Sequence, residues 1–550
     1  MADIQKELND IKNAVYGREV RGAIHDGIKK INEEVEDATD LSESAKHQVE
    51  NIQQQVNQLV VEGDSSVEAA QARVDADGNT FTTLKERLDT KETQFASQLE
   101  QNEQKTNYLL NRALMKNGKL KLPNDFRKLP FEITRIGKRQ YFHNATPYNQ
   151  HDWAGATEIF IAHENHSNKD GTDYNSPITL DRFAENLNSG IYGSQKNFIL
   201  NILSNVYTRS AWLEVNELNV NLYIRSRSWS GFTWFARVKR ENVEMEPWVL
   251  DGTIYKTTID VETHNILDVL NFVETDGFGI PHPYQKVTSL TNCQQNKGSF
   301  YQEGATVWVN PYPEHTINNL VLLVSTRLID INIGANNTVI FENIGFTTNT
   351  YRIRGSHPSA KFYFFGCKWH RGQNDAFGIT GAYQVYLFNN VSAWASKDGF
   401  NYHSSTEESL AVEINCVSYG NGKYKLESGN TTTHSNNGST AHDGMYMLRV
   451  GGKYWDCEGP IVTDADDCYS ISIGCEVGNI LDSTTGTRAG YYVYDGDSTV
   501  HRPKYIIECL ANGKNITWGI RGTHNTFYMD FEGTDNHHGD IKLIDWEEVV

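Results

Sequence analysis

Long apolar runs are missing from this sequence. No segment approaches the ~20 consecutive apolar residues that a helix needs to cross a bilayer. The opening residues, MADIQKELND, are charged from the third position and hold no apolar core of a signal peptide. We therefore expect no membrane segment and no conventional export signal, and we expect synthesis in the cytoplasm.

A positive charge balance is missing as well. The chain has 70 Asp and Glu against 50 Lys and Arg, which gives a formal net charge of −20. This excess of negative charge argues against nucleic acid, and against an anionic membrane surface, as the main partner. An anionic glycopolymer would have to be held through its sugars rather than through charge alone.

Proline and cysteine are scarce. Only 12 Pro stand beside 43 Gly, and Asn, Thr, Tyr and Trp are frequent after residue 140, which predicts a turn-rich β protein. The seven Cys are scattered and form no C-x-x-C pair, so we interpret them as buried, reduced thiols. The sequence has no Walker loop, no G-x-S-x-G and no H-E-x-x-H, and we predict neither a cofactor nor a metal site.

What the sequence does contain is, first, an apolar heptad seam over residues 31–59. The a positions are Ile31, Ala38, Ala45, Ile52 and Leu59, and the d positions are Val35, Val49 and Val56, with Ser42 as the one polar interruption. A seam held through four heptads with charged and Gln-rich flanks predicts a coiled coil. We predict a helical stalk over residues 31–115 with a break near 63–80. A homotrimer is the preferred assembly, because β-branched core residues tolerate it.

Strand periodicity and a repeat follow in the second part of the chain. Aligning Asn343, Gly366, Asn390 and Asn415 gives steps of 23, 24 and 25 residues. Self-similarity at this length, made of strands, predicts a solenoid. The predicted inward-facing pairs are Ile344/Phe346, Cys367/Trp369 and Val391/Ala393, followed by Cys416. Residues 116–155, with Pro123, Pro130 and Pro147, are predicted to be an irregular neck before this body.

The start of the second part has a characteristic order of elements. The run TEIFIAHENHSNKDGTDYNSPITLDRFAENLNSG reads as a strand, an Asp-Gly turn and a short helix capped by Asp181. It resembles the opening of right-handed parallel β-helix proteins of the pectate-lyase-like superfamily, in which that helix covers the first coil. The resemblance implies a right-handed parallel β-helix over residues 156–550. Such a cover hides strand edges and apolar interior at the open end of the coil.

One acidic motif recurs inside the repeat, at Asp375, Asp398 and Asp443. Asp375 and Asp398 are 23 residues apart, which is one turn of the coil, and Asp443 follows 45 residues later. Since neighbouring strands lie about 4.8 Å apart, we expect the three carboxylates along one edge at steps of roughly 5 Å. This spacing is compatible with glycoside hydrolysis, and stacked carboxylates raise one another's pKa. The alternative is that Asp-Gly only marks the turn at each corner.

Aromatic and imidazole side chains accompany these carboxylates in the sequence. Candidates for stacking on sugars are Trp369, Trp394, Phe400 and Tyr402, and candidates for orienting a carboxylate or binding a hydroxyl are His403 and His442. Three interpretations stay open: turn residues, a glycan-binding edge without catalysis, or a hydrolytic site. Asp464, Asp466 and Asp467 loosely resemble a calcium loop, but a solvated acidic turn is favoured, because the twelve-residue pattern is missing.

The N-terminal block NAVYGREVRGAIHDGIKKINEE contains Tyr-Gly-x-x-Val-Arg-Gly. It resembles the block that opens baseplate and tail-fibre proteins of phages that infect Gram-positive bacteria. AAQARVDADGNTFTTLKERLD and STAHDGMYMLRVGGKYWDCEGPIVTDADD resemble further segments of such proteins. The resemblance implies a virion anchor over residues 1–30, with Tyr16, Arg18, Val20 and Arg21 docking onto other tail proteins.

These observations predict a tail-fibre or baseplate protein of the virion. We expect it to bind a glycopolymer of the host cell wall, such as teichoic acid, without cleaving it, since several weak sites on a trimer give high avidity. A depolymerase that uses Asp375, Asp398 and Asp443 is the first alternative, so enzymatic activity stays open. A purely structural fibre is the second.

Overall fold

The computed structural model describes part of the chain. The described residues are 42–54, 85, 87–91 and 115–544, the last range without 117, 163–169, 208–212, 217–219, 229, 236–237, 240–245, 260–262, 264, 269–276, 282–283, 324–328, 348–350, 372–373, 423–435, 482–486, 495–500 and 535. The chain divides into two compact units, Met1–Leu109 and Leu110–Val550. Within the described ranges, no helix is both long enough and apolar enough to span a bilayer.

The first unit is helical where it is described. Residues 42–54 and 87–91 form helix, and Lys85 pairs with Asp89 at 2.7 Å. From the predicted heptad seam, Val49 and Ile52 fall in the described helix, and they are 65% and 47% exposed in the single chain. The predicted anchor residues Tyr16, Arg18, Val20 and Arg21 lie outside the described residues, so the anchor and the full coiled coil remain predictions.

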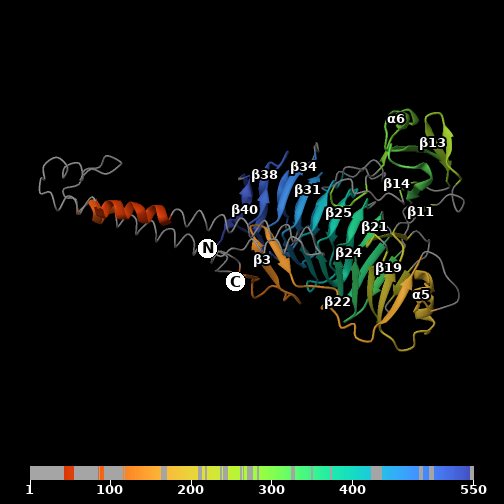
Figure 1. The fold of residues 1–550 in the computed structure, drawn as a ribbon, viewed down its shortest axis with the longest axis horizontal. Coiled ribbons are helices and arrows are strands. Elements are labelled where there is room, and N and C mark those ends of the chain that lie inside the picture. The colour runs from red at the N-terminus through yellow and green to blue at the C-terminus, as the bar shows by residue number, and fades with distance from the viewer. Residues whose placement is uncertain are drawn as a thin grey trace. The chain divides into compact units, whose positions relative to one another are not determined.

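The second unit is built on a solenoid of parallel strands (Figure 1). Successive coils add strands to three sheets. The first and second sheets are continuous, because the long strands β22 (Tyr351–Phe365), β24 (Phe377–Phe388) and β38 (Trp518–Met529) run around the corner between them. Strand β24, for example, pairs with β26 through its first half and with β27 through its second half. This arrangement confirms a mainly β protein with a parallel β-helix.

The three sheets are made of the following strands. The first sheet has the N-terminal halves of the long strands together with β8 (Leu213–Asn216), β19 (Ile329–Ile333), β26 (Phe400–Tyr402), β29 (Ser439–Ala441), β32 (Val462–Ala465) and β35 (Ala489–Tyr494). The second has their C-terminal halves together with β5 (Thr157–Ile161), β6 (Asn197–Ile202), β9 (Asn221–Ser226), β20 (Thr338–Glu342), β27 (Leu410–Ile414), β30 (Tyr446–Val450), β33 (Tyr469–Ile473) and β36 (Lys504–Ile507). β40 (His537–Leu543) pairs with both halves of β38. The third has β7 (Val206–Tyr207), β10 (Thr233–Phe235), β21 (Ile344–Thr347), β23 (Lys368–His370), β25 (Val391–Ala393), β28 (Val417–Tyr419), β31 (Lys453–Cys457), β34 (Glu476–Ile480), β37 (Leu510–Ala511) and β39 (Glu532–Gly533).

A single left-handed residue makes the corner between the second and third sheets. Its φ lies between 50° and 65° at Asn343, Gly366, Asn389, Asn415, Gly451, Gly474, Glu508 and Asp530. Asn and Gly tolerate this conformation best, which is why they mark the repeat in the sequence. The third corner is Asn389 and not Asn390, so the predicted alignment is wrong there by one residue.

That shift exchanges the two faces of one strand. Val391 and Ala393 were predicted to face inward, but they belong to an apolar cluster on the outer side of the third sheet. Cys367, Trp369 and Cys416 lie in the interior cluster, as predicted. All seven Cys are buried and free, which confirms the interpretation as packed thiols.

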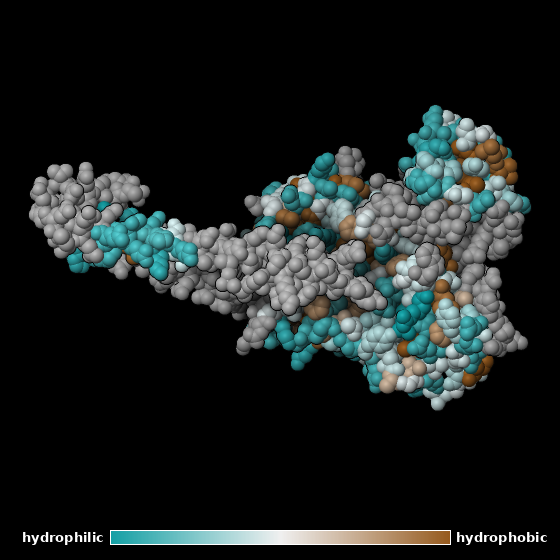
Figure 2. Space-filling model, viewed as in Figure 1, coloured by the Kyte–Doolittle hydropathy of each residue, from teal (hydrophilic) through white to brown (hydrophobic). Residues whose placement is uncertain are grey.

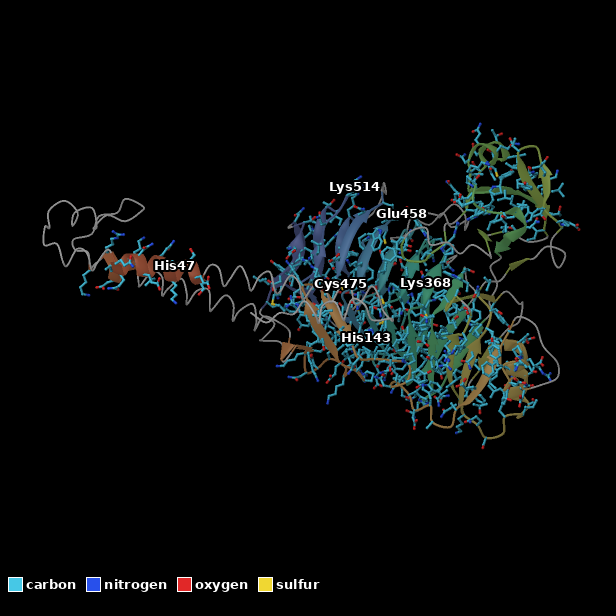
Figure 3. All side chains as sticks on the ribbon, in the orientation of Figure 1. His47, His143, Lys368, Glu458, Cys475 and Lys514 are labelled. Atoms are coloured by element: carbon cyan, nitrogen blue, oxygen red, sulfur yellow. The ribbon has the colours of Figure 1, made fainter. Side chains whose placement is uncertain are left out.

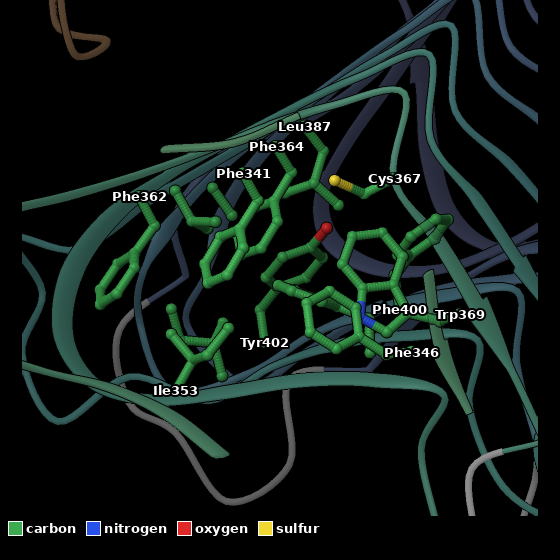
Figure 4. Packing of buried hydrophobic residues seen from close by; sticks show 14 of the residues in the cluster. Phe341, Phe346, Ile353, Phe362, Phe364, Cys367, Trp369, Leu387, Phe400 and Tyr402 are labelled. Carbon is green, nitrogen blue, oxygen red and sulfur yellow. The ribbon is translucent and has the colours of Figure 1, made fainter. Parts of the chain in front are cut away.

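Stacked side chains fill the interior of the coil (Figure 4). Phe341 and Phe364, on neighbouring strands, stack with ring centroids 5.0 Å apart and planes 3° from parallel. Phe346 and Trp369 stack in the same way at 5.8 Å. In-register parallel strands place equivalent residues directly above one another, so each ring covers the next.

The first coils are covered by helix α5 (Leu180–Asn188), as the resemblance implied. Leu180 and Phe183 insert into the interior cluster and are at most 1% exposed. The N-cap is Thr179, whose Oγ1 accepts the backbone N–H of Arg182, so the predicted cap at Asp181 is wrong by two residues.

Residues 118–156, which cover most of the predicted irregular neck (116–155), form an ordered strap on the outer face of the second sheet. The strap contains β2 (Lys119–Leu120), β3 (Ile133–Gly137) and β4 (Gln140–His143), which pair antiparallel and continue from β1 (Met115–Lys116). Its side chains Phe126, Phe131, Ile133, Tyr141 and Trp153 pack on outward-facing Ile, Leu, Val and Tyr side chains of the second sheet. The neck prediction was wrong because the apolar residues between the prolines cover an apolar sheet face.

A separate, mainly antiparallel domain leaves the solenoid between β10 and β19, and the sequence had not predicted it. This inserted domain (residues 238–323) is labelled β11, β13, β14 and α6 in Figure 1. A five-stranded sheet has the order β12-β13-β17-β16-β15, and a three-stranded sheet has the order β11-β18-β14. The elements are β11 (Val238–Lys239), β12 (Val249–Asp251), β13 (Ile254–Thr258), β14 (Asn265–Asp268), β15 (Gln285–Lys286), α6 (Leu290–Gln295), β16 (Ser299–Glu303), β17 (Thr306–Asn310), the 3-10 helix η1 (Ile317–Asn319) and β18 (Leu320–Leu323).

The inserted domain has its own core and is tied to the third sheet. Phe300, Val307 and Val309 belong to a cluster separate from the solenoid interior. Lys368, labelled in Figure 3, donates to the carbonyl of Gly279 at 3.2 Å. Ile280 packs in the outer cluster of the third sheet. Residues 156–550 are therefore a solenoid with a domain inserted in one coil.

Candidate functional site

Two of the three outer faces of the solenoid carry apolar cover. The strap packs along the second sheet, and Ile280 of the inserted domain packs on the third. None of the four apolar clusters formed by the described residues lies on the outside of the first sheet. That face is the strongest candidate for contact with a ligand.

The strand register aligns the outward side chains of the first sheet in two rows. One row runs Arg354, Thr380, His403, His442, Ala465, Tyr494, and the other runs Arg352, Gly378, Asn401, Thr440, Thr463, Tyr492. We call these two rows, with their continuation onto β38 and β40, the first-sheet face. It is polar and aromatic, whereas the inward side chains of the same strands are mainly apolar. Its exposed members include His403 and Tyr494, while Asn401, Thr440, Thr463 and Ala465 are at most 7% exposed.

The predicted acidic ladder begins as expected, with Asp375 and Asp398 one coil apart. Asp398 donates its backbone N–H to Asp375 Oδ1 at 3.3 Å, and Asn437 donates its backbone N–H to Asp398 Oδ1 at 2.7 Å. Each carboxylate thus accepts a backbone N–H at the corner of the next coil. Asp398 is only 8% exposed. Burial, and then the charge of Asp375, raise the pKa of Asp398 well above its usual range.

Asp443 does not continue this ladder. Phe400 pairs with Ser439, so the residue that lies beside Asp398 in the next coil is Asn437. Asp443 lies six residues farther along, at the opposite end of β29. The prediction of three carboxylates on one edge is therefore wrong, because Asp-Gly turns occur at two different corners of the coil. The partly buried pair Asp375 and Asp398 fits the interpretation as turn residues.

A different polar cluster surrounds Asp443 on the first-sheet face. His403 Nδ1 lies 3.2 Å from Asp443 Oδ2, and both side chains are 46% exposed. The His403 and His442 rings stack with centroids 4.3 Å apart and planes 2° from parallel. Burial and the neighbouring His403 lower the pKa of His442 to about 4. The predicted role of His403 and His442 in orienting a carboxylate or binding a hydroxyl stays a prediction, for which His403 has a carboxylate within reach.

Asp466 joins this cluster from the next coil. Ala441 pairs with Asp464, so Asp443 and Asp466 occupy equivalent positions in the turns that follow β29 and β32 in adjacent coils. Both residues have left-handed backbones, with φ of 61° and 59°. Burial and the nearby Asp443 raise the pKa of Asp466. An ionisable pair of this kind, on an open face, can hydrogen-bond hydroxyl groups or share a proton.

Three of the predicted sugar-stacking residues are core residues. Trp369, Phe400 and Tyr402 are 0% exposed and lie in the interior cluster (Figure 4). Trp394 lies on the outer side of the third sheet, where its ring meets Tyr419 edge to face at 5.4 Å. The prediction that Trp369, Phe400 and Tyr402 bind glycan is wrong, because all three are enclosed. For Trp394, which lies on another face of the solenoid, it stays a prediction.

Asp464 also points inward, so the acidic turn is divided between two environments. Arg449 Nη1 donates to Asp464 Oδ1 at 2.8 Å inside the coil, and Arg449 Nε donates to Ser439 Oγ at 2.7 Å. Glu413 completes this buried network by accepting from Ser439 and Tyr454 at 2.6 Å each. Across the described residues, no group of three His, Cys, Asp or Glu side chains is arranged to hold a metal ion.

The sequence reasoning missed an aromatic patch on the C-terminal coils of the first-sheet face. Tyr492 and Tyr494 stack at 6.1 Å, and Tyr494 is 49% exposed. The guanidinium of Arg521 lies over both Tyr492, at 5.5 Å, and Trp518, at 5.1 Å. Trp518 in turn contacts the ring of His538 at 5.5 Å. The only sequence signal was the Tyr-rich strand AGYYVY, whose outward Tyr residues follow from strict alternation.

This patch and the cluster around Asp443 give the first-sheet face two complementary kinds of chemistry. Aromatic faces pack against the apolar C–H surface of a sugar ring, while imidazole, carboxylate and guanidinium groups hydrogen-bond its hydroxyls. Arg521 adds a cation that can pair with a phosphate or carboxylate substituent. The arrangement extends across several coils, which suits an extended polymer better than a small molecule.

Comparisons with known proteins concern the fold. No protein-family model matches the chain, and no curated protein matches it. A solved structure described as a glycoside hydrolase has 9% identity and a TM-score of 0.49, over 70% of this chain and 95% of that one. A complex of XylC with xylose has 9% identity and a TM-score of 0.39, over 69% of each chain. Pectate lyase Pel9A has 10% identity and a TM-score of 0.31, over 70% of this chain and 80% of that one. At this level of similarity, the fold assignment rests on the strand pairings described above.

Proposed function

We propose that the protein is a tail-fibre or baseplate component of a phage of Gram-positive bacteria, and that it attaches to the host cell wall by binding glycopolymer. The observation that carries the binding proposal is the first-sheet face, which is polar, aromatic and without an apolar cover among the described residues. The virion role is supported by the sequence resemblance of the N-terminal block. The polymer is bound along several coils through Tyr492, Tyr494 and Arg521 and through the cluster around Asp443.

A homotrimer is part of the proposal. The seam residues Val49 and Ile52 are exposed on the described helix, and apolar side chains at heptad spacing are expected to be buried between copies of the chain. Sedimentation equilibrium of the full chain is expected to give three times the chain mass, and Val49→Asp with Ile52→Asp is expected to lower it. A monomeric wild-type protein would contradict this part of the proposal.

The binding test uses full-length protein sedimented with purified Gram-positive cell walls. Half of each wall sample is treated with hydrofluoric acid, which removes teichoic acid. We expect native walls to retain the protein, and we expect Tyr494→Ala and Arg521→Gln each to weaken retention about tenfold. Tyr174→Ala is the matched control, because Tyr174 is 62% exposed and packs on Phe160 of β5 instead.

The outcomes separate the candidate partners. Retention by native walls that is lost after hydrofluoric acid identifies teichoic acid as the ligand, and retention by both samples identifies peptidoglycan. If no wall retains the protein, or if Tyr174→Ala weakens retention as much as Tyr494→Ala, the attachment proposal fails. A purely structural fibre is then the better description.

A second candidate function is cleavage of the bound polymer, and one observation favours it. Asp443 and Asp466 lie at equivalent positions of adjacent coils, and burial and the nearby charge of Asp443 raise the pKa of Asp466, as an acid catalyst requires. Release of sugar or phosphate from walls is expected to stop in Asp443→Asn and Asp466→Asn while retention persists. Asp398→Ala is the control, because the Asp398 carboxylate accepts a backbone N–H at a corner of the coil and does not face the polymer.

A further inference from the structure

In the inserted domain, one face of the five-stranded sheet packs on the core. Helix α6 covers part of the other face, where Ser299 and Asn310 donate hydrogen bonds to its carbonyls, and leaves the rest open. Phe300, Val307 and Val309 of the five-stranded sheet face its core, together with Leu320 and Leu322 of the three-stranded sheet. Strict alternation places the neighbouring residues of the same strands on the opposite face. That opposite face belongs to none of the four apolar clusters formed by the described residues.

One row of side chains crosses the open face. The register pairs Tyr301 with Trp308, Trp308 with Lys256, and Lys256 with Val249, so the four residues lie side by side on β16, β17, β13 and β12. Tyr301 and Trp308 are half-buried, and Val249 is 56% exposed. In Figure 2 the part of the molecule that Figure 1 labels β13 carries apolar surface.

The two rings are held in place before any ligand arrives. They stack with centroids 5.8 Å apart and planes 25° from parallel. The indole Nε1 of Trp308 donates to Asp251 Oδ2 at 2.9 Å, and Lys256 Nζ lies 3.2 Å from the same oxygen. A ring fixed by a neighbouring ring and by a hydrogen bond loses little entropy on binding, so it is a preorganised contact.

The chemistry around the rings selects a ligand class. The platform combines flat aromatic surface, an exposed aliphatic side chain, and one cation beside one anion, with Lys256 and Asp251 exposed by 44% and 41%. Because the two charges compensate each other, a polyanion gains little there. A neutral pyranose offers the complement, since one face of its ring presents C–H groups and its rim presents hydroxyls.

We propose that Tyr301 and Trp308 form a platform that binds neutral sugar rings, a second glycan site on the inserted domain. The site shares no residue with the first-sheet face, and it depends on neither the virion role nor the attachment proposal. Asp251 and Lys256 hydrogen-bond the hydroxyls of the sugar that stacks on the rings. An inserted module of this kind adds affinity through a second contact to the same polymer or a neighbouring one.

The test is calorimetric titration of the full chain with neutral oligosaccharides, namely chitotetraose, cellotetraose, maltotetraose and mannotetraose. We expect at least one of them to bind, and we expect Trp308→Ala and Tyr301→Ala each to weaken that binding about tenfold or more. Trp308→Phe keeps a ring and is expected to retain most of the affinity. Tyr174→Ala, at an exposed ring outside both proposed glycan sites, is expected to bind the same oligosaccharide like the wild type.

Three results would overturn the proposal. The first is that none of the four oligosaccharides binds. The second is that binding survives both Trp308→Ala and Tyr301→Ala. The third is that Trp308→Ala loses both binding and its melting transition, while Tyr301→Ala melts and binds like the wild type. This result would assign Trp308 to stability alone.

Discussion

The imidazole rings of His403 and His442 lie parallel on adjacent strands of the first sheet, with centroids 4.3 Å apart. Parallel strands in register place equivalent side chains on top of one another, so a His at the same position of two coils produces this stack. Two protonated rings at this distance would repel each other. The pair therefore makes the face sensitive to acid.

The first prediction concerns the stability of the protein in acid. Burial and His403 lower the pKa of His442 to about 4, below the value near 6.5 of an unfolded chain. The unfolded state binds this proton first, so stability that is present above pH 6.5 is lost as the pH falls toward 4, by up to about 3 kcal/mol. His442→Gln is expected to reduce that loss, measured as urea midpoints at pH 7, 5.5 and 4.5. His538→Gln, at an exposed histidine, is the control. If the urea midpoint of His442→Gln falls with pH as steeply as that of the wild type, the loss of stability in acid does not come from His442.

The second prediction concerns the acidic corner. The pKa of Asp398 is raised in the folded protein, so ionisation of its carboxyl group opposes folding. The stability that the protonated carboxyl provides is therefore lost as the pH rises through the pKa of the folded state. Asp398→Asn keeps an acceptor for the Asn437 N–H and is expected to stabilise the protein by about 1 kcal/mol at pH 7. Asp398→Ala leaves that N–H unsatisfied and is expected to destabilise by about 1–2 kcal/mol. If Asn and Ala destabilise equally, the corner needs the carboxylate itself.

The third prediction concerns the charges inside the coil. Arg449 is 0% exposed and pairs with Asp464, while Glu413 lies in the same network. Replacing Arg449 by Met removes the cation that pairs with the buried Asp464, and the expected loss is about 3–5 kcal/mol in denaturant unfolding. Glu413→Gln keeps the hydrogen-bond geometry and is expected to cost less. Equal losses in the two variants would show that the network is not organised around Arg449.

The fourth prediction concerns the strap. Phe131 is 9% exposed and meets the rings of Tyr386 and Phe388 edge to face at 5.6 and 5.1 Å. Phe131→Ala is expected to lower the free energy of unfolding by about 3 kcal/mol and to open the strap to proteolysis. Phe142→Ala, on the same strap but 58% exposed, is the matched control and is expected to change stability by less than about 0.5 kcal/mol. Equal effects of the two variants would contradict the packing role of Phe131.

The solenoid could be predicted from the sequence because its corners use residue types with a special backbone. A left-handed corner favours Asn or Gly, so Asn343, Gly366 and Asn415 mark the repeat directly. The error at Asn389 arose because Asn390 follows it, and either could occupy the corner. Only the strand register distinguishes the two, and it decides which face each later side chain occupies.

The site was harder to predict for the same kind of reason. Trp369, Phe400 and Tyr402 alternate like residues of an exposed aromatic row, and periodicity alone does not say which side of a strand is the inside. Asp443 was assigned to the wrong corner because Asp-Gly marks any tight turn. The inserted domain was missed because its strands have the same period of two as those of the solenoid.

The strap has a mechanical consequence for the solenoid when a force acts along its axis. Trp153 packs on Tyr223 in β9, near the first coils, and Arg139 pairs with Glu532 in β39, in the last coils. A stack of coils alone resists tension only through contacts between neighbours. Here the backbone of the strap runs beside the stack of coils and contacts it near both ends. The strap therefore shares a load that is applied along the axis of the stack.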